Sequence, residues 1–314
     1  MNDELKQWLE MLRSPDVNDR LVAVKTLQHL GEEETIDALI IALKDENVAV
    51  QKIAISALWE IANPVAIPAL IECLSSTDTD VRTEAASALN ELITQDDLLL
   101  LLDKIQSDDI NTKLNILVLL RKIHDIQSLP HILPFLQANN PELREATITT
   151  LRYLNQLENC PQALDLIIDE SAVVRRATAL TLGHLKDTEV IAKLNQALTH
   201  DSDWQVRRNA AKSLAIHANH QAISALTIAL GDENWQVRKA SAQALQTIFD
   251  IKVMPKLIQA LTDEYADVRK EAVIALGNLA HPDVINPLQQ ALDDPDKEVA
   301  IQAQRAIQKI QINI

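Results

Sequence analysis

The chain has 314 residues, of which 47% are hydrophobic and 24% charged, and it contains only 4 glycines. This composition excludes a disordered chain and indicates a folded helical protein rich in Ala and Leu. Its formal net charge of −16 repels phosphate backbones and anionic lipid, so nucleic acid is not an expected partner.

Two cysteines, Cys73 and Cys160, are far apart in the sequence, and neither belongs to a C-x-x-C pair. This usage predicts neither a disulfide framework nor a zinc site and favours a reducing compartment. The first residues lack the basic start of a secretory signal, and no apolar stretch approaches the length needed to cross a bilayer. We therefore expect a cytoplasmic protein without membrane insertion.

A repeat becomes visible when DSDWQVRRNAAKSL is aligned with DENWQVRKASAQAL, because Arg207 and Arg238 then stand 31 residues apart. Steps of 31, with one step of 32, define ten equivalent positions along the chain, which we call slots. Most slots hold Arg or Lys. In chain order they are Arg20, Gln51, Arg82, Lys113, Arg144, Arg175, Arg207, Arg238, Arg269 and Ala300.

Two apolar columns follow the slots. Seven residues after each slot stands a Leu, or Ile307 in the last repeat, and ten residues after it stands an aliphatic residue in every repeat except at His217. These spacings indicate one face of a helix, with a buried stripe at offsets −1, +2, +3, +6, +7 and +10 and an exposed face at +1, +5, +8 and +12.

A second apolar segment, such as IDALIIAL or ISALTIAL, precedes each slot. A short polar link such as KDEN or GDEN joins this first helix of the repeat to the second helix, which contains the slot. The links supply N-caps for the second helix. One pair of helices cannot bury both its faces, so neighbouring pairs must stack. The sequence thus predicts an all-α solenoid (superhelix) of about ten two-helix repeats, forming a single domain over residues 1–314 with a period of about 31 residues.

The segment AIPALIECLSSTDTDVRTEAASALNEL resembles HEAT repeats of the phycobilisome-lyase (E/Z type) group, as do TIALGDENWQVRKASAQALQTI and LIQALTDEYADVRKEAVIALGNL. The resemblance covers nearly the whole chain. It implies a stacked Asp/Arg ladder, which the recurring Asp-x-x-x-x-x-Arg spacing matches, and it implies that the second helices line a concave side.

Three functions remain open at this point. The first is a non-enzymatic scaffold, adaptor or chaperone that binds a folded protein on its concave face. The resemblance also implies two alternatives: a bilin (phycocyanobilin-type) lyase, or lyase subunit, acting on a phycobiliprotein, and an accessory protein for iron–sulfur cluster assembly. We favour the non-enzymatic role; the partner would then be another protein, such as a phycobiliprotein or an iron–sulfur carrier.

Known catalytic and cofactor signatures are absent from the sequence. None of the 8 histidines is followed by Glu, as the HEAT-type iron hydroxylases require, and no P-loop or G-x-G-x-x-G occurs. His217 interrupts an apolar column near His184 without a carboxylate or thiol at ligand spacing, so we interpret it as a structural histidine. We expect no catalytic residue, no metal and no cofactor.

Apolar, aromatic and Arg side chains break the otherwise polar exposed face in three repeats, which is the composition of a protein-binding hot spot. We also expect Leu117 to lie beside Leu114 and Val118 on this face. The predicted partner-binding residues are Trp59, Leu114, Val118, Arg121, Arg152 and Tyr153.

Four successive repeats carry a second base directly after the slot. The first base of each pair belongs to the ladder, and we expect the second to point outward, toward solvent or an acidic partner. This secondary basic stripe consists of Arg176, Arg208, Lys239 and Lys270.

Overall fold

The computed structural model describes residues 3–31, 33–248 and 250–313. These residues form twenty α-helices joined by short turns and 3₁₀ segments, and no strand occurs among them. Odd-numbered helices (A helices) alternate with even-numbered helices (B helices), and every slot lies in a B helix. Ten helix pairs therefore confirm the predicted all-α solenoid and its period.

The chain packs into two compact units, and the predicted single domain over 1–314 stays a prediction. Unit 1 runs to Ala138 and includes Tyr153–Gln156. Its helices are α1 (Asp3–Met11), α2 (Val17–Leu30), α3 (Ile36–Ala42), α4 (Val48–Ile61), α5 (Ile67–Glu72), α6 (Thr79–Leu92), α7 (Leu98–Lys104), α8 (Ile110–Ile123) and α9 (Leu129–Ile132).

Unit 2 comprises Asn139–Arg152 and the residues from Leu157 onward. Its helices are α10 (Pro141–Leu151), α11 (Pro161–Leu164), α12 (Ala172–Thr181), α13 (Val190–His200), α14 (Trp204–His217), α15 (Ile223–Ala229), α16 (Trp235–Ala244), α17 (Met254–Ala260), α18 (Ala266–Leu279), α19 (Ile285–Gln290) and α20 (Lys297–Asn313).

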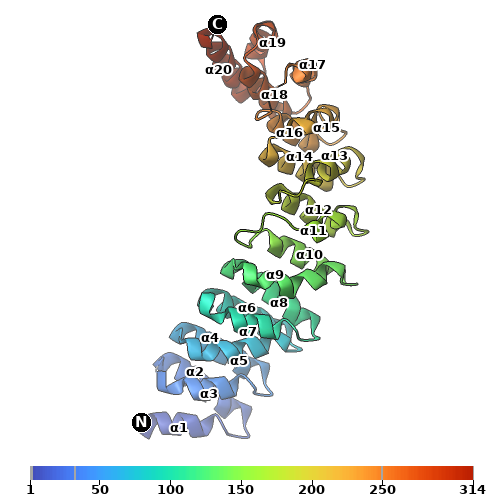
Figure 1. The fold of residues 1–314 in the computed structure, drawn as a ribbon. Helices are drawn as coiled ribbons and strands as arrows, with labels where there is room; N and C mark the ends of the chain where they lie inside the picture. Colours follow the sequence, from blue (N-terminus) through green and yellow to red (C-terminus); the bar gives the residue numbers. More distant parts are fainter. Residues whose placement is uncertain (1–2, 32, 249, 314) are drawn as a thin grey trace. The chain divides into compact units, whose positions relative to one another are not determined.

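Within each unit, the B helices pack against the B helices of the neighbouring repeats, and most of them also pack against the A helix of their own repeat (Figure 1). The B helix α12 instead packs against the 3₁₀ segment Asp165–Ile168 that continues its A helix. The links cap the B helices as predicted: the side chains of Asn47 and Asp78, for example, accept backbone N–H groups in the first turns of α4 and α6. Several B helices end on a left-handed residue, which is glycine only at Gly31. The sequence thus sets both ends of the helix.

The core follows the +7 column, which is buried in nine repeats and half-buried at Ile307. The predicted stripe left out offset +4, which is buried in most repeats, as at Val24. Offset +2, which it included, is buried at Ala240 and Glu271 but exposed at Val22. B helices touch an A-helix segment and the next B helix at once, so the buried face is wider than the predicted stripe.

An arginine ladder joins successive repeats. The slot Arg donates Nη1 to a carbonyl oxygen five or six residues earlier, and its Nε and Nη2 bind both carboxylate oxygens of an Asp in the next repeat, at 2.6 to 3.1 Å. The predicted ladder is confirmed, but the carboxylate comes from the following repeat. The pairs are Arg20–Asp45, Arg144–Asp169, Arg175–Asp201, Arg207–Asp232, Arg238–Asp263 and Arg269–Asp294.

The ladder lacks its carboxylate in three successive repeats of unit 1. Gln51 and Arg82 still bind the carbonyl oxygens of Asp45 and Ser76, at 2.7 Å each, but the positions 25 residues after them are Ser76 and Ser107. The corresponding position after Lys113 is an alanine, residue 138. Repeats two to four therefore lack this bidentate ion pair with the repeat that follows them.

Candidate protein-binding surface

Trp59 stands at offset +8 on α4, and 45% of its surface is exposed. Its ring lines a crevice of about 430 Å³ between α4 and α6, whose other lining residues are Ile55, Ser56, Glu84, Ser87, Ala88 and Glu91. The crevice is open because α6 presents Ser87 and Ala88 to the ring, and these side chains are too small to cover it. Trp59 is therefore an exposed aromatic residue with an unfilled space beside it.

The exposed apolar residues of α8 are fewer than the sequence predicts. Val118 is 48% exposed, and Leu114 is half-buried. Leu117 is fully buried, so its expected place beside them on the surface was wrong. It occupies offset +4, which is buried in most repeats. Val118 is thus the clearest surface position on this helix.

The remaining predicted partner-binding residues differ in their surroundings. Arg121 on α8 is half-buried, and Tyr153 is 41% exposed, with its carbonyl oxygen 2.8 Å from Nδ1 of His124. Arg152 belongs to unit 2, where it is half-buried and its Nε has no hydrogen-bond partner in the described part of the chain. Unit 1 therefore contains five of the six predicted residues, which remain predictions as a binding site.

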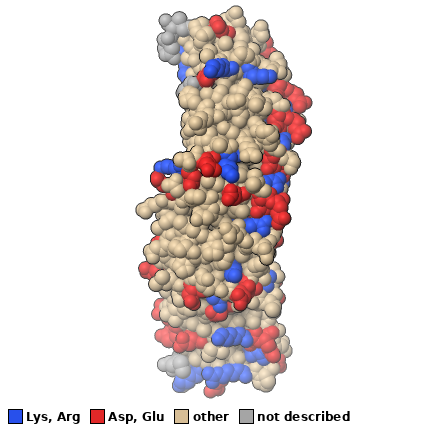
Figure 2. Space-filling view, turned by 45° about the vertical axis from the view of Figure 1, so that its right-hand side comes forward, with Lys and Arg blue, Asp and Glu red and all other residues tan. Residues whose placement is uncertain are grey.

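The secondary basic stripe is more tightly held than expected. Arg176 forms a bidentate ion pair with Asp203, and this hydrogen bond lowers the pKa of the Asp203 carboxyl. Asp267 lies 3.1 Å from Lys239 Nζ and 3.8 Å from Lys270 Nζ. In the face drawn in Figure 2, Lys and Arg side chains lie among Asp and Glu side chains rather than forming a continuous basic area.

Arg208 differs from the other members of the stripe. Among the described residues, its guanidinium binds only neutral acceptors, the side-chain oxygens of Asn209 and Gln236, and it lies 5.2 Å from the centre of the Trp204 ring. Lys212, which is not among the predicted site residues, lies nearby with its side chain largely exposed. Partial burial of its ammonium group and the charges of Arg208 and Lys239 lower its pKa. The offset +5 shared by Lys212 and Val118 could have identified it.

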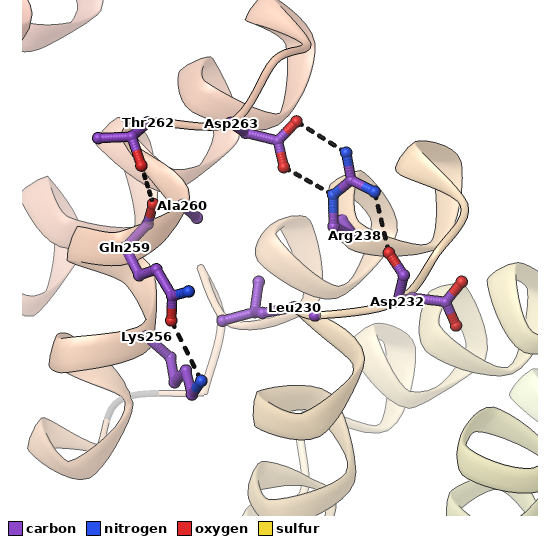
Figure 3. A pocket seen from close by; sticks show the side chains of 9 residues that line it. Leu230, Asp232, Arg238, Lys256, Gln259, Ala260, Thr262 and Asp263 are labelled. Carbon is purple, nitrogen blue, oxygen red and sulfur yellow. Dashed lines mark hydrogen bonds and ion pairs between the residues drawn. The ribbon is translucent and has the colours of Figure 1, made fainter.

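The crevices beside the ladder are a property of the repeat. Figure 3 shows one of about 290 Å³ in which Arg238 is already bound by Asp263 and by the carbonyl oxygen of Asp232. A similar crevice lies beside Arg175 two repeats earlier. Because the arginine in each crevice is already bound by a carboxylate and a backbone carbonyl oxygen, we interpret these crevices as structural features of the ladder rather than ligand sites.

The histidines near the middle of the chain make structural contacts. Nε2 of His217 lies 2.8 Å from the carbonyl oxygen of Leu182, which explains how a histidine occupies the apolar column. Burial, together with the charges of Arg152 and His217, lowers the pKa of His184. In the described ranges, no three His, Cys, Asp or Glu residues are arranged to hold a metal ion, and no helix there is long and apolar enough to cross a membrane.

Both thiols are buried and expected to be unreactive. Burial, assisted by the charge of Glu72, raises the pKa of Cys73 to about 11, and burial also raises the pKa of Cys160. At pH 7 only about one Cys73 thiol in ten thousand is then ionised. Iodoacetamide should label neither cysteine in the folded protein and both in guanidinium chloride, as measured by mass spectrometry. Rapid labelling of folded Cys73 would contradict its burial.

The comparisons with known proteins agree with this architecture. A family model described as HEAT repeats matches residues 5–90, 161–246 and 254–312, well over half of the chain. A search among curated proteins finds no match. The unmatched stretch between residues 90 and 161 contains five of the six predicted partner-binding residues, three of them on α8 and two directly after α10.

Solved structures show the same fold. An engineered protein is 22% identical, with a TM-score of 0.56 and 99% of each chain covered. Kap95p is 14% identical, with a TM-score of 0.65; the match covers 98% of this chain and 49% of Kap95p, about half of its length. The family match and the observed repeats together show that this chain is a repeat scaffold and belongs to the HEAT-repeat family.

Proposed function

We propose that this protein is a non-enzymatic adaptor that binds a folded protein partner on its B-helix surface, with the main contact in unit 1. The observation that carries the proposal is the crevice beside Trp59, an exposed ring on a face where the other repeats present mainly polar side chains. Exposed aromatic residues set in partly enclosed surroundings dominate the energetics of many protein interfaces. Val118, two repeats further along the same unit, supplies a second apolar contact.

The same fold is used for this purpose in another protein. Kap95p, whose fold resembles this chain, binds RanGDP. This is an analogy of fold and does not identify a partner. The narrower candidates, a chaperone, a bilin lyase acting on a phycobiliprotein or an accessory to an iron–sulfur carrier, rest on the sequence resemblance. The burial of Cys73 and Cys160 does not favour thiol chemistry, so we retain the adaptor without a cofactor.

Substitution of the exposed apolar residues tests the proposal. The partner is first captured from the source cells with the intact chain, identified by mass spectrometry and purified for direct titration. Trp59→Ala and Val118→Asp should each weaken binding about tenfold or more, because hot-spot contacts are lost. Circular dichroism and the melting temperature should be nearly unchanged, since both side chains are exposed.

The matched control is Ile41→Asp, which places a charge on an exposed apolar residue of the A helix α3 that is 64% exposed. It should leave the affinity unchanged. If Trp59 and Val118 variants bind normally while Arg208→Ala or Lys270→Ala abolishes binding, the interface lies on the secondary basic stripe instead, and the proposed surface is wrong.

A further inference from the structure

Acidic residues outnumber basic ones most strongly in unit 1, which also contains the Trp59 crevice. Residues 1–138 contain 23 Asp and Glu against 11 Lys and Arg, so unit 1 carries most of the net charge of −16. A field of this sign concentrates cationic partners and repels anionic ones. The Trp59 crevice therefore lies within the more acidic of the two units.

The crevice itself has one aromatic wall and two carboxylates. Glu84 is held by Lys52, whose Nζ lies 3.0 Å away and also contacts Asp80 at 3.2 Å. Glu91 is exposed, and its carboxylate has no hydrogen bond or ion pair with any described residue. The nearby Lys122 binds the carbonyl oxygens of Asn90 and Glu91 at the end of α6, not the carboxylate. The α4 side of the crevice thus presents the face of the Trp59 ring, and the α6 side presents the unpaired negative charge of Glu91.

We infer that this crevice binds an Arg or Lys side chain from a basic and apolar segment of the protein partner. The aliphatic part of such a side chain would lie against Trp59, and its cationic end would reach Glu91. A cation over an indole ring is attracted to it, and Arg also stacks on the ring plane. The inference rests on the proposed function and specifies the chemistry of its partner.

A polypeptide fits this site better than a free small cation. Aromatic cages for small ammonium ligands surround the cation with several rings, whereas Trp59 is the only aromatic residue among those lining the crevice. A single ring and an exposed carboxylate bind weakly, so further contacts are required. The exposed Val118 on α8, two repeats further along, provides an apolar contact for a residue farther along the same segment.

A random linear peptide library displayed on phage tests the inference with the intact 314-residue chain. The library is selected on the wild type, and peptides that also bind the Trp59→Ala variant are removed. This selection should enrich peptides that contain Arg or Lys together with aliphatic or aromatic residues. A selected peptide is then synthesised and titrated. Trp59→Ala should weaken its binding about tenfold or more, and Glu91→Gln about two- to fivefold, with the affinity falling as salt rises.

Glu72→Gln is the matched control, because it removes the same charge from the A helix α5 of the same unit, where Glu72 is exposed and pairs with Lys104. It should change the affinity less than Glu91→Gln does. Enrichment of acidic or uncharged peptides that still require Trp59 would overturn the inference and leave the proposed surface intact. The inference would also be overturned if no Trp59-dependent peptide were recovered, or if the two Gln variants changed the affinity equally. In either case, loss of partner binding in the Val118→Asp variant would still support the proposed function.

Discussion

Replacing Leu182 by Ala should lower the free energy of unfolding by about 2–5 kcal/mol, the range measured for buried leucines that leave a cavity. Leu182 stands in the +7 column and is completely buried at the end of α12. In a repeat array, stability is the sum of each repeat and its contacts with its neighbours, so the loss should be local as well. Urea unfolding gives the magnitude, and hydrogen exchange followed by mass spectrometry should show faster exchange in α12 and α14.

Leu99→Ala is the control for this experiment, because Leu99 on α7 is 73% exposed and its removal creates no cavity. The change should stay within about 0.5 kcal/mol, as for most surface substitutions. Equal losses for Leu99 and Leu182 would mean that the buried column has been assigned to the wrong helical face. A loss at Leu182 spread evenly over all helices would argue instead that the array unfolds as one cooperative unit.

The sequence alone predicts the repeat, its period and the pairs of helices, because these depend on local spacing. The +7 column illustrates this: a leucine recurring in register faces the core in repeat after repeat. The +10 column is less reliable, since Leu30 precedes the left-handed Gly31 at a helix end and is 39% exposed. Burial at a helix end depends on the neighbouring repeat, which spacing within one helix does not describe.

The candidate site could be predicted only in part for the same reason. Trp59 and Val118 were found because an apolar residue at an exposed offset is visible in the sequence. The charge that completes the crevice, Glu91, comes from the next repeat, and Leu117 was misplaced because the rotation of α8 about its axis depends on packing. Contacts between repeats join residues 25 or more positions apart, and no local pattern specifies their geometry.

Removing one carboxylate of the ladder should destabilise two repeats at once. Asp263 receives the Nε and Nη2 groups of Arg238 at 2.6 and 2.9 Å, and both side chains are nearly buried. Asp263→Ser should cost about 2–3 kcal/mol, slightly less than breaking a fully buried ion pair. Serine is the informative replacement, because the Asp263 carboxylate also accepts the Tyr265 N–H and Ser76 fulfils that second role in its own link.

This loss should depend on pH in a defined direction. Burial alone would raise the pKa of Asp263, but the hydrogen bonds from Arg238 and Tyr265 and the charges of Arg238 and Arg269 hold it below its usual value. A carboxylate with a lowered pKa stabilises the fold above the pKa of the unfolded chain, about 4, and this contribution disappears as the pH falls through the folded value. The wild type and Asp263→Ser should therefore differ most at neutral pH and converge in acid.

The gap in unit 1 allows the converse experiment. Ser107 stands 25 residues after Arg82, as Asp263 does after Arg238, so Ser107→Asp would supply the missing carboxylate to an arginine that already binds the Ser76 carbonyl. We expect it to stabilise the fold by about 1 kcal/mol, since the new pair is more enclosed than a surface ion pair. Ser76→Asp is the control, because the residue facing it is the uncharged Gln51. If both substitutions have the same effect, the carboxylate acts on its own link rather than through the arginine of the preceding repeat.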